Sequence, residues 1–523
     1  MQATGWLSAL FAVIALAGCA GSEPDVRPHV QANEALAADG GMQACALHEP
    51  VLTISPQHAE AVPAGTPVTY AITITNMDTP SCPPSEFSSS VSPSLAGLPF
   101  QIEPEFLQTP ALSGGQSATL QVHVTSHEQE EAGVYRLSFF VRSPLGERAR
   151  TRMAEAEYQV REPEGCHVAP ARELLIRDPS VVDDEVRTSG AQRGAWSFGE
   201  LMRRAARAPE DAPGVVEAML RSFTEEQTVN GFRVAARPNM EPNVLKTWPR
   251  TDNGEIDLMR APLRMLAIAH RLDLGEGRFV FGVLTRDGAS QLFTLILEYS
   301  LPGDAHDWAH SVHALQALPF PSEAYNSALQ RLTDRFSARG VAPDRPHGSA
   351  LLRVRTNENS LGRDGRWEMR EFRLSARSGA LEPAGLALTP DRSWNGKAQL
   401  ARFIDDNAPG ILREAHNVPI SLEDQPFQAG SLINELGHWD ARGVHDPEAR
   451  RLFSLNTCDG CHGGETFTSF FHVFPRGAGE QSALSGFLTG PVVRDPLSVS
   501  PRTYNELHRR RQLLERVVCG AGD

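Results

Sequence analysis

Lysine is almost absent from this chain, and long hydrophobic runs are rare. Lys246 and Lys397 are the only lysines, a bias general enough to indicate codon composition rather than function. The formal net charge of −15 argues against nucleic acid and anionic lipid surfaces as partners. Outside residues 6–17, no stretch is long and apolar enough to cross a bilayer. G-x-S-x-G, H-E-x-x-H and P-loop motifs are also missing, so the sequence has no hydrolase or nucleotide-binding signature.

The apolar run over residues 6–17 has the length of a signal-peptide core and is followed by Gly18 and Cys19. Small residues directly before a cysteine resemble the lipobox of bacterial lipoproteins, although residues 1–5 contain no Lys or Arg. The resemblance implies a signal peptide over 1–18, lipidation of Cys19 and attachment of the mature chain to a membrane. An ordinary cleavable signal with a chance cysteine is the alternative. Either way, we expect a cell-envelope location, on the periplasmic or the outer-surface face, with a flexible tether over 19–44.

The cysteine count fits an exported protein. The seven cysteines are Cys19, Cys45, Cys82, Cys166, Cys458, Cys461 and Cys519. Setting aside Cys19 for the lipid and the Cys458/Cys461 pair for the motif described below leaves four. An even number in an oxidising compartment suggests two disulfides. We predict the pairs Cys45–Cys82 and Cys166–Cys519, the second tying the start of the large C-terminal region to the end of the chain.

Residues 45–162 have the pattern of an all-β domain. Apolar residues alternate with polar ones through Val68–Ile74, Leu120–Val124 and Tyr135–Val141, with glycine-containing turn signals between the runs. Short strands at this spacing predict a β-sandwich. The run from Cys45 through Cys82 to the Ala-Gly-Val-Tyr sequence at 132–135 resembles the bacterial Ig-like modules appended to secreted glycosidases and metalloproteases. That resemblance implies an accessory domain that spaces or docks a partner, without catalytic residues.

Residues 163–440 predict a central α+β domain. Ser197 and Ser322 are expected to cap helices, and two β-rich runs on either side of Asp287-Gly288 predict a hairpin. The region resembles the central part of bacterial secreted lipoproteins that end in the same Asn-Thr-Cys-x-Gly-Cys-His sequence, a resemblance that implies no activity. Charge is concentrated over residues 270–278, which we interpret as a turn with surface ion pairs rather than as the lining of a cleft. His306, His310 and His313 have a helical spacing suited to metal binding but are more simply solvent-facing or packed histidines.

The C-terminal segment, residues 441–523, is predicted to be mainly α-helical and contains Cys458-Asp459-Gly460-Cys461-His462. C-x-x-C-H is the spacing at which two thiols attach to haem vinyl groups while the next imidazole binds the iron. A helix after Asp446-Pro447 delivers the motif and resembles the N-terminal helix of small c-type cytochromes. Phe467, Phe470, Phe471 and Phe474 are candidate apolar walls. The sequence therefore predicts a covalent haem c site, with Cys458, Cys461, His462 and His472 binding the cofactor.

The second axial ligand is the weak point of this prediction. No Met follows Met369, so the candidates are His472, His508 and His438, and we favour His472. Two alternatives remain open. Cys458 and Cys461 can form a structural or redox disulfide, or they can bind zinc together with His462 and His472.

Taken together, the sequence predicts a multidomain chain with an N-terminal Ig-like sandwich, a central α+β domain and a mainly α C-terminal segment. Its expected role is electron transfer or haem chemistry beside a redox or envelope protein partner. The competing hypothesis is a non-catalytic binding or envelope-structural lipoprotein whose C-x-x-C only stabilises the fold.

Overall fold

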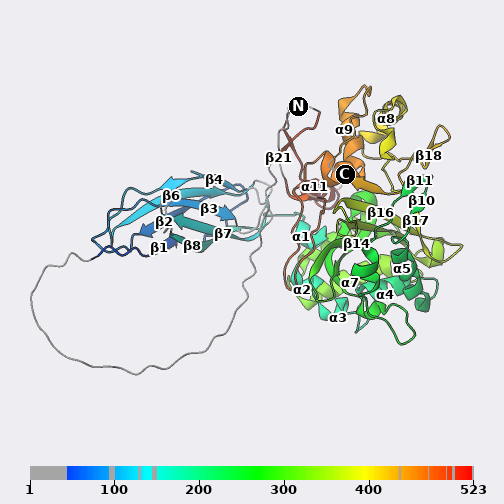
Figure 1. The fold of residues 1–523 in the computed structure, drawn as a ribbon, viewed down its shortest axis with the longest axis horizontal. Coiled ribbons are helices and arrows are strands. Elements are labelled where there is room, and N and C mark those ends of the chain that lie inside the picture. Colours follow the sequence, from blue (N-terminus) through cyan, green and yellow to red (C-terminus); the bar gives the residue numbers. More distant parts are fainter. Residues whose placement is uncertain are drawn as a thin grey trace, which may run out of the picture.

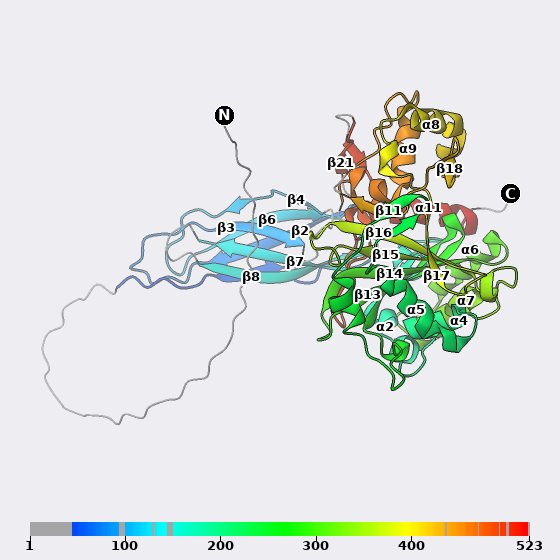
Figure 2. The ribbon, with the colours of Figure 1, turned by 45° about the vertical axis from the view of Figure 1, so that its right-hand side comes forward.

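We describe a computed structural model of the chain. It describes residues 44–93, 100–127, 130, 132–143, 150–434, 437–468, 470–490, 492–497 and 501–520. The predicted signal peptide over 1–18, Cys19 and all of the predicted tether except Ala44 lie outside these residues. Figures 1 and 2 show two bodies, a sandwich made of the first eight strands and a larger body that follows it.

The sandwich consists of two four-stranded antiparallel sheets. One sheet has the order β1 (Val51–Ser55), β2 (Pro67–Thr75), β6 (Ser117–Thr125) and β4 (Gln101–Glu103), and the other has the order β5 (Leu107–Gln108), β3 (Ser88–Pro93), β7 (Gly133–Arg142) and β8 (Thr151–Val160). Tyr70, Ile72 and Ile74 alternate along β2 and are fully buried against residues of the second sheet such as Phe139. The alternation read from the sequence is therefore confirmed as one buried face per sheet.

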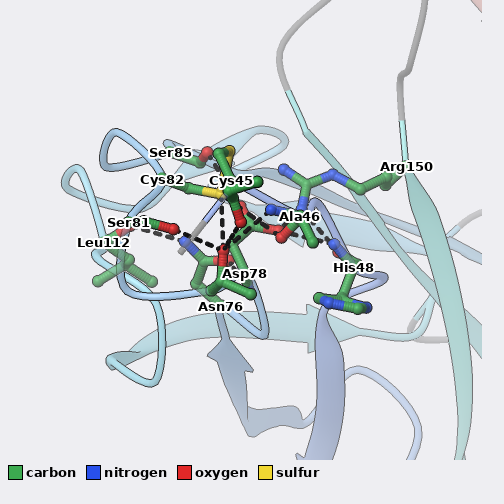
Figure 3. The surroundings of a disulfide bond; sticks show 12 residues. Cys45, Ala46, His48, Asn76, Asp78, Ser81, Cys82, Ser85, Leu112 and Arg150 are labelled. Atoms are coloured by element: carbon green, nitrogen blue, oxygen red, sulfur yellow. Dashed lines mark hydrogen bonds and ion pairs between the residues drawn. A yellow bond between two sulfur atoms is a disulfide. The ribbon is translucent and has the colours of Figure 1, made fainter. Parts of the chain in front are cut away.

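The predicted Cys45–Cys82 disulfide is present at one end of the sandwich (Figure 3). Next to it, the buried carboxylate of Asp78 accepts a hydrogen bond from the His48 backbone N–H at 2.8 Å and pairs with the Arg150 guanidinium. The Arg150 guanidinium also donates to the His48 carbonyl at 2.6 Å. The disulfide and this ion pair fasten the residues that precede β1 to the rest of the sandwich.

An antiparallel eight-stranded sheet forms the centre of the larger body. Its order is β17 (Leu381–Ala384), β16 (Trp367–Leu374), β15 (Leu351–Glu358), β14 (Ser290–Ser300), β13 (Glu276–Leu284), β12 (Leu263–Arg271) and β9 (Leu175–Ile176), with β20 (Leu432–Asn434) also paired to β16. The predicted hairpin is β13–β14, and Gly288 takes the left-handed φ of +84° that its turn needs. Sequence neighbours pair as hairpins rather than through βαβ crossovers, as an α+β region requires.

Eleven α-helices occur among the described residues. They are α1 (Pro170–Glu173), α2 (Pro179–Val182), α3 (Glu185–Thr188), α4 (Phe198–Ala205), α5 (Ala212–Arg221), α6 (Ala305–His313), α7 (Glu323–Ser337), α8 (Ala398–Ile411), α9 (Pro447–Asn456), α10 (Gly486–Thr489) and α11 (Glu506–Val518). Short strand pairs complete the body: β10 (Gln227–Val229) with β11 (Phe232–Val234), β18 (Ser421–Leu422) with β19 (Gln425–Pro426), and β21 (Val492–Arg494) with β22 (Pro501–Thr503). Ser197 and Ser322 cap α4 and α7 as predicted. None of the helices within the described ranges is long and apolar enough to cross a membrane.

The two faces of the large sheet carry different residues. Phe279 on β13 and Leu297 on β14 are paired in register and lie in the main core with residues of α4, α5 and α7. Their neighbours Arg278 and Glu298 are also paired, so they project from the opposite face. Part of the described C-terminal segment packs on that opposite face, where Leu507 of α11 shares a core with Ala267 and Ala269 of β12, whereas Leu514 of the same helix lies in the main core.

The C-terminal segment therefore shares cores with residues 163–440 instead of forming one of its own. Cys458 and Phe471 pack with Trp367 and Met369 of β16. The predicted Cys166–Cys519 disulfide is present and joins the start of the larger body to the residue after α11.

Candidate functional site

Helix α9 delivers the C-x-x-C-H motif to the sheet. The Asp446 side chain caps it by accepting from the backbone N–H groups of Glu448 at 2.8 Å and Ala449 at 3.3 Å. After α9 the chain turns sharply, and a Cβ atom at Gly460 would lie 1.8 Å from the Ser454 carbonyl oxygen. Only glycine fits at this close approach, so position 460 is set by packing.

Asp459, inside the motif, anchors the turn from within. Its buried carboxylate accepts from Trp439 Nε1 at 2.8 Å and from Arg392 Nη1 at 2.7 Å. The backbone N–H of Cys458 donates to Thr389 Oγ1 at 2.9 Å. These bonds hold the motif in one orientation.

Both motif cysteines have free thiols. Cys458 is buried and Cys461 partly so, whereas the other four described cysteines are paired. Burial raises the pKa of both thiols, that of Cys461 to about 12. The thiols are therefore protonated at neutral pH.

Both predicted histidines are held through Nδ1, and His472 presents its Nε2 to Cys461. The Nδ1 atom of His462 lies 2.6 Å from the Phe470 carbonyl oxygen, so it carries the proton and donates. His472 has Nδ1 2.9 Å from Ser485 Oγ and Nε2 3.0 Å from Cys461 Sγ. Burial lowers the pKa of His462 to about 4 and that of His472 well below its usual value, so both imidazoles are neutral.

Ligand atoms of Cys461, His462 and His472 lie within 4.8 Å of one another. Cys458 is outside this close group. Three of the four residues predicted from the sequence thus already have the spacing of metal ligands, each imidazole with the second hydrogen-bond partner that metal-binding histidines normally have.

His472 does not lie opposite His462, however. The two rings are stacked with centroids 3.9 Å apart and planes inclined by 28°. Two axial imidazoles must face each other end to end, with each nitrogen about 2 Å from the metal between them. Stacked rings leave no space for an ion between them, so the arrangement suits two ligands on the same side.

The four predicted residues all line one cavity of about 550 Å³. Its apolar wall comes from Leu388, Leu452, Leu455, Phe487 and Tyr504. His508 also lines it, with a buried Nδ1 that has no hydrogen-bond partner among the described residues, whereas His438 does not contribute. The volume lies in the range of small-molecule and cofactor sites.

The expected phenylalanine wall is wrong in detail. Phe470 stacks on Trp367 with planes 13° apart, and Phe471 and Phe474 pack in the same cluster behind the motif. Phe467 is 55% exposed. Phe487, from α10, takes the place at the cavity that sequence proximity suggested for these rings.

Arginine is the feature of the cavity that the sequence did not reveal. Seven arginines line it: Arg271, Arg278, Arg355, Arg451, Arg502, Arg509 and Arg510. The interpretation of residues 270–278 as a surface turn is wrong, because Arg271 and Arg278 face the cavity and His270 is fully buried. The high density of charged residues over 270–278 was a signal that the sequence offered. Arg355 and Arg510, which join them at the cavity, lie too far away in the sequence for a local pattern to connect them.

The remaining histidine constellation is not brought together. His306 and His310 are exposed neighbours on α6, with Nε2 atoms 3.2 Å apart. His313 turns away, and its Nδ1 lies 2.9 Å from the buried carboxylate of Glu173. These positions agree with the interpretation that the three histidines face solvent or are packed.

No protein-family model matches this chain, and no curated protein does. Among solved structures, the PapD-like domain 7 of human CEP192 is similar at 13% identity and a TM-score of 0.18, covering 26% of this chain and all of that one. The periplasmic chaperone SfaE is similar at 14% identity and a TM-score of 0.16, covering 24% of this chain and 62% of that one. A family 123 glycoside hydrolase from Clostridium perfringens follows at 12% identity and a TM-score of 0.15, covering 22% and 28% of the respective chains. At such TM-scores these likenesses say nothing about the site.

Proposed function

We propose that this chain is an extracytoplasmic lipoprotein that carries covalent haem c on Cys458 and Cys461, with His462 as an iron ligand. One observation carries the proposal: two free thiols and the adjacent imidazole line a single cavity of about 550 Å³. Each protonated thiol is suited to add across a vinyl double bond, forming a C–S bond while its hydrogen goes to the other vinyl carbon. That step needs no oxidant. When bound, haem would supply one-electron chemistry or a site for small ligands.

The residues around the motif fit this assignment. The Phe470 carbonyl holds the His462 proton on Nδ1 and leaves the Nε2 lone pair for a metal. Because His472 is stacked beside His462, it is not assigned as a second iron ligand in the proposal. His508, which lines the same cavity, would be the candidate for that role, and haem without a second protein ligand would supply a site for small molecules.

Zinc is the second candidate, and a specific observation supports it. Cys461, His462 and His472 have ligand atoms within 4.8 Å of one another, and a tetrahedral site needs only one more donor, for which Cys458 is nearest in sequence. The structural-disulfide alternative has less support, since both thiols are free.

In this proposal, the N-terminus attaches the chain to a membrane and the sandwich connects it to a partner. Cys19 would anchor the chain through lipid, and the sandwich would act as an Ig-like spacer or docking module for a redox or envelope partner. The non-catalytic hypothesis uses the same parts without a cofactor. Mass spectrometry of the N-terminal peptide tests the anchor, and an unmodified Cys19 would refute it.

A pyridine haemochrome spectrum tests the cofactor. The full chain is produced with a haem c maturation system and purified under denaturing conditions that remove non-covalent haem. We expect a haem c spectrum that disappears in the Cys458→Ala/Cys461→Ala variant and persists in the matched Cys45→Ala/Cys82→Ala variant. Absence of covalent haem from the wild-type chain refutes the proposal. Stoichiometric zinc in that same sample, lost in His472→Ala, would establish the second candidate.

A further inference from the structure

Four arginines, here called the arginine cluster, stand beside the histidine pair. They are Arg271 of β12, Arg278 of β13, Arg355 of β15 and Arg510 of α11. All four line the 550 Å³ cavity and also a smaller inner cavity of about 100 Å³. His462 and His472 line both cavities as well. The arginine cluster and the two imidazoles thus form the boundary at which the cavities meet.

Carboxylates around the cavity fix the guanidinium groups. Arg271 is held by Asp273 through two bonds of 3.0 and 2.9 Å, and Arg278 by Glu276 through bonds of 3.0 and 2.5 Å. Arg355 is held by Glu371 through bonds of 3.2 and 3.1 Å. These bonds involve Nε and Nη2 of each arginine, which orients the planar fork of donors. The cluster is therefore preorganised before any ligand arrives.

Arg510 is the least satisfied member. Its Nε donates to Glu506 at 2.8 Å, and among the described residues no partner is found for its terminal nitrogens. Arg510 is only 8% exposed. Burial, followed by the proximity of Arg271, lowers its pKa to about 10. Arg510 is therefore paired with Glu506 through Nε alone, and this buried guanidinium keeps free terminal donors beside a cationic neighbour.

Arginines outnumber carboxylates in the lining of the inner cavity. The lining has four arginines against Glu298 alone, although each arginine also has a carboxylate partner outside it, namely Asp273, Glu276, Glu371 or Glu506. The neutral imidazoles add no negative charge. Because these partners offset the charge of the cluster, the attraction for an anion comes from the donors that remain unpaired, above all the terminal nitrogens of Arg510.

The inner cavity also limits the size of a ligand. At about 30 Å³ per water molecule, a volume of about 100 Å³ holds roughly three waters or one small oxyanion. Apolar residues such as Val280, Ile296 and Leu488 form much of the remaining wall, and Thr294 and Asn357 add polar groups to it. A ligand with a long polar chain would leave its groups unpaired there.

We propose that the arginine cluster binds a small free oxyanion of phosphate size in the inner cavity, next to the imidazoles of His462 and His472. Guanidinium groups donate charge-assisted hydrogen bonds to oxyanions, and those of four arginines converge here from three strands and a helix, with the terminal nitrogens of Arg510 free to donate. The site does not depend on a cofactor at the cysteines. It therefore goes beyond the proposed haem function.

Titration with inorganic phosphate tests the site. The full chain with Cys458→Ala/Cys461→Ala, which cannot hold haem covalently, is titrated by isothermal calorimetry with sodium chloride at equal ionic strength as reference. We expect saturable binding of one phosphate per chain. In the same background, Arg510→Gln should weaken binding by about tenfold or more, because it removes a charge-assisted donor pair. Arg502→Gln, which lines only the larger cavity, is the matched control and should bind as its parent does.

The outcomes separate this proposal from the cofactor. Binding that is absent, non-saturable or equally weakened by Arg502→Gln overturns it. Arg510→Lys, which keeps the charge and loses the planar fork, gives a second readout if Arg510→Gln fails to fold, with intermediate affinity expected. Phosphate binding to the haem-free variant that vanishes in a haem-loaded chain also overturns it, because the arginines would then serve the cofactor's carboxylates. Failure to load haem leaves the phosphate titration unaffected.

Discussion

In the sandwich, the residues that alternate with buried Tyr70 and Ile72 reach solvent, whereas in the eight-stranded sheet the residues that alternate with Phe279 and Leu297 are covered. Both sheets obey the same period of two. The difference is that a second layer, formed by part of the described C-terminal segment, closes over the polar face of the large sheet. A covered polar face must be paired or it is costly, and the arginines and carboxylates of that face meet this need. Buried and paired polar side chains therefore distinguish the larger sheet from the sandwich.

The largest difference in stability between the two bodies is expected when Glu298 is replaced. Its carboxylate, 1% exposed, lies within 3.5 Å of nitrogens of Arg278, Arg353 and Arg355. Glu298→Gln leaves their charges without this partner, and we expect the larger body to lose about 3–5 kcal/mol of unfolding free energy. Urea titration followed by tryptophan fluorescence measures this, because the sandwich contains no tryptophan.

Asp78→Asn is the control in the sandwich, where the buried Asp78 pairs with Arg150. It should leave the tryptophan transition in place and shift only the sandwich transition in calorimetry. If both substitutions move both transitions, the two bodies unfold as one and the comparison fails.

The two disulfides, one in each body, are expected to stabilise them by different amounts. Cys166–Cys519 closes a separation of 353 residues and Cys45–Cys82 one of 37. In the chain-entropy model, removing the longer link by serine substitution at both positions costs about 2 kcal/mol more than removing the shorter. Calorimetry of each double variant gives the two losses. Equal losses would show that chain entropy does not govern these links.

Acidity should affect the larger body through Glu173, which is fully buried beside His313. Burial raises the pKa of Glu173 to about 8. A carboxyl group whose pKa is raised by folding stabilises the fold fully below its unfolded pKa, about 4.3, and this contribution is lost as the pH rises toward 8. Glu173→Gln should flatten the decline over that window, an effect on the order of 2 kcal/mol. Urea midpoints at pH 5 and pH 8 measure it, and an unchanged difference between wild type and variant refutes it.

The smallest effect is expected at the helix cap before the motif. Asp446→Ala removes the two capping bonds of α9 and should cost about 1 kcal/mol. The Cys458 and Cys461 thiols should then react faster with an alkylating agent. Ser322→Ala, which uncaps α7, is the matched control and should leave thiol reactivity unchanged.

Local signals explain what could be predicted from the sequence. Strand alternation, the caps at Ser197 and Ser322 and the Asp-Gly hairpin depend on nearby residues, and each is confirmed. Both disulfide pairs are also present. The arginine cluster escaped prediction because its members lie at 271, 278, 355 and 510 and meet only through sheet pairing and the packing of α11. The stacking of His472 on His462 likewise depends on the turn between them, for which no sequence pattern exists.

Helix α11 has a consequence for the order in which the site can be completed. The helix contributes His508 and Arg510 to the cavity. The residue that directly follows the helix, Cys519, forms a disulfide with Cys166. Under the proposed export, a chain that emerges from its N-terminus would present the sandwich first and this helix last. The cavity thus stays open on one side until almost the entire chain has emerged, which gives a bulky group a route of entry that the finished fold narrows. Under the proposed haem function, loading would precede closure, and a chain truncated before α11 would leave the group on its cysteines exposed to solvent.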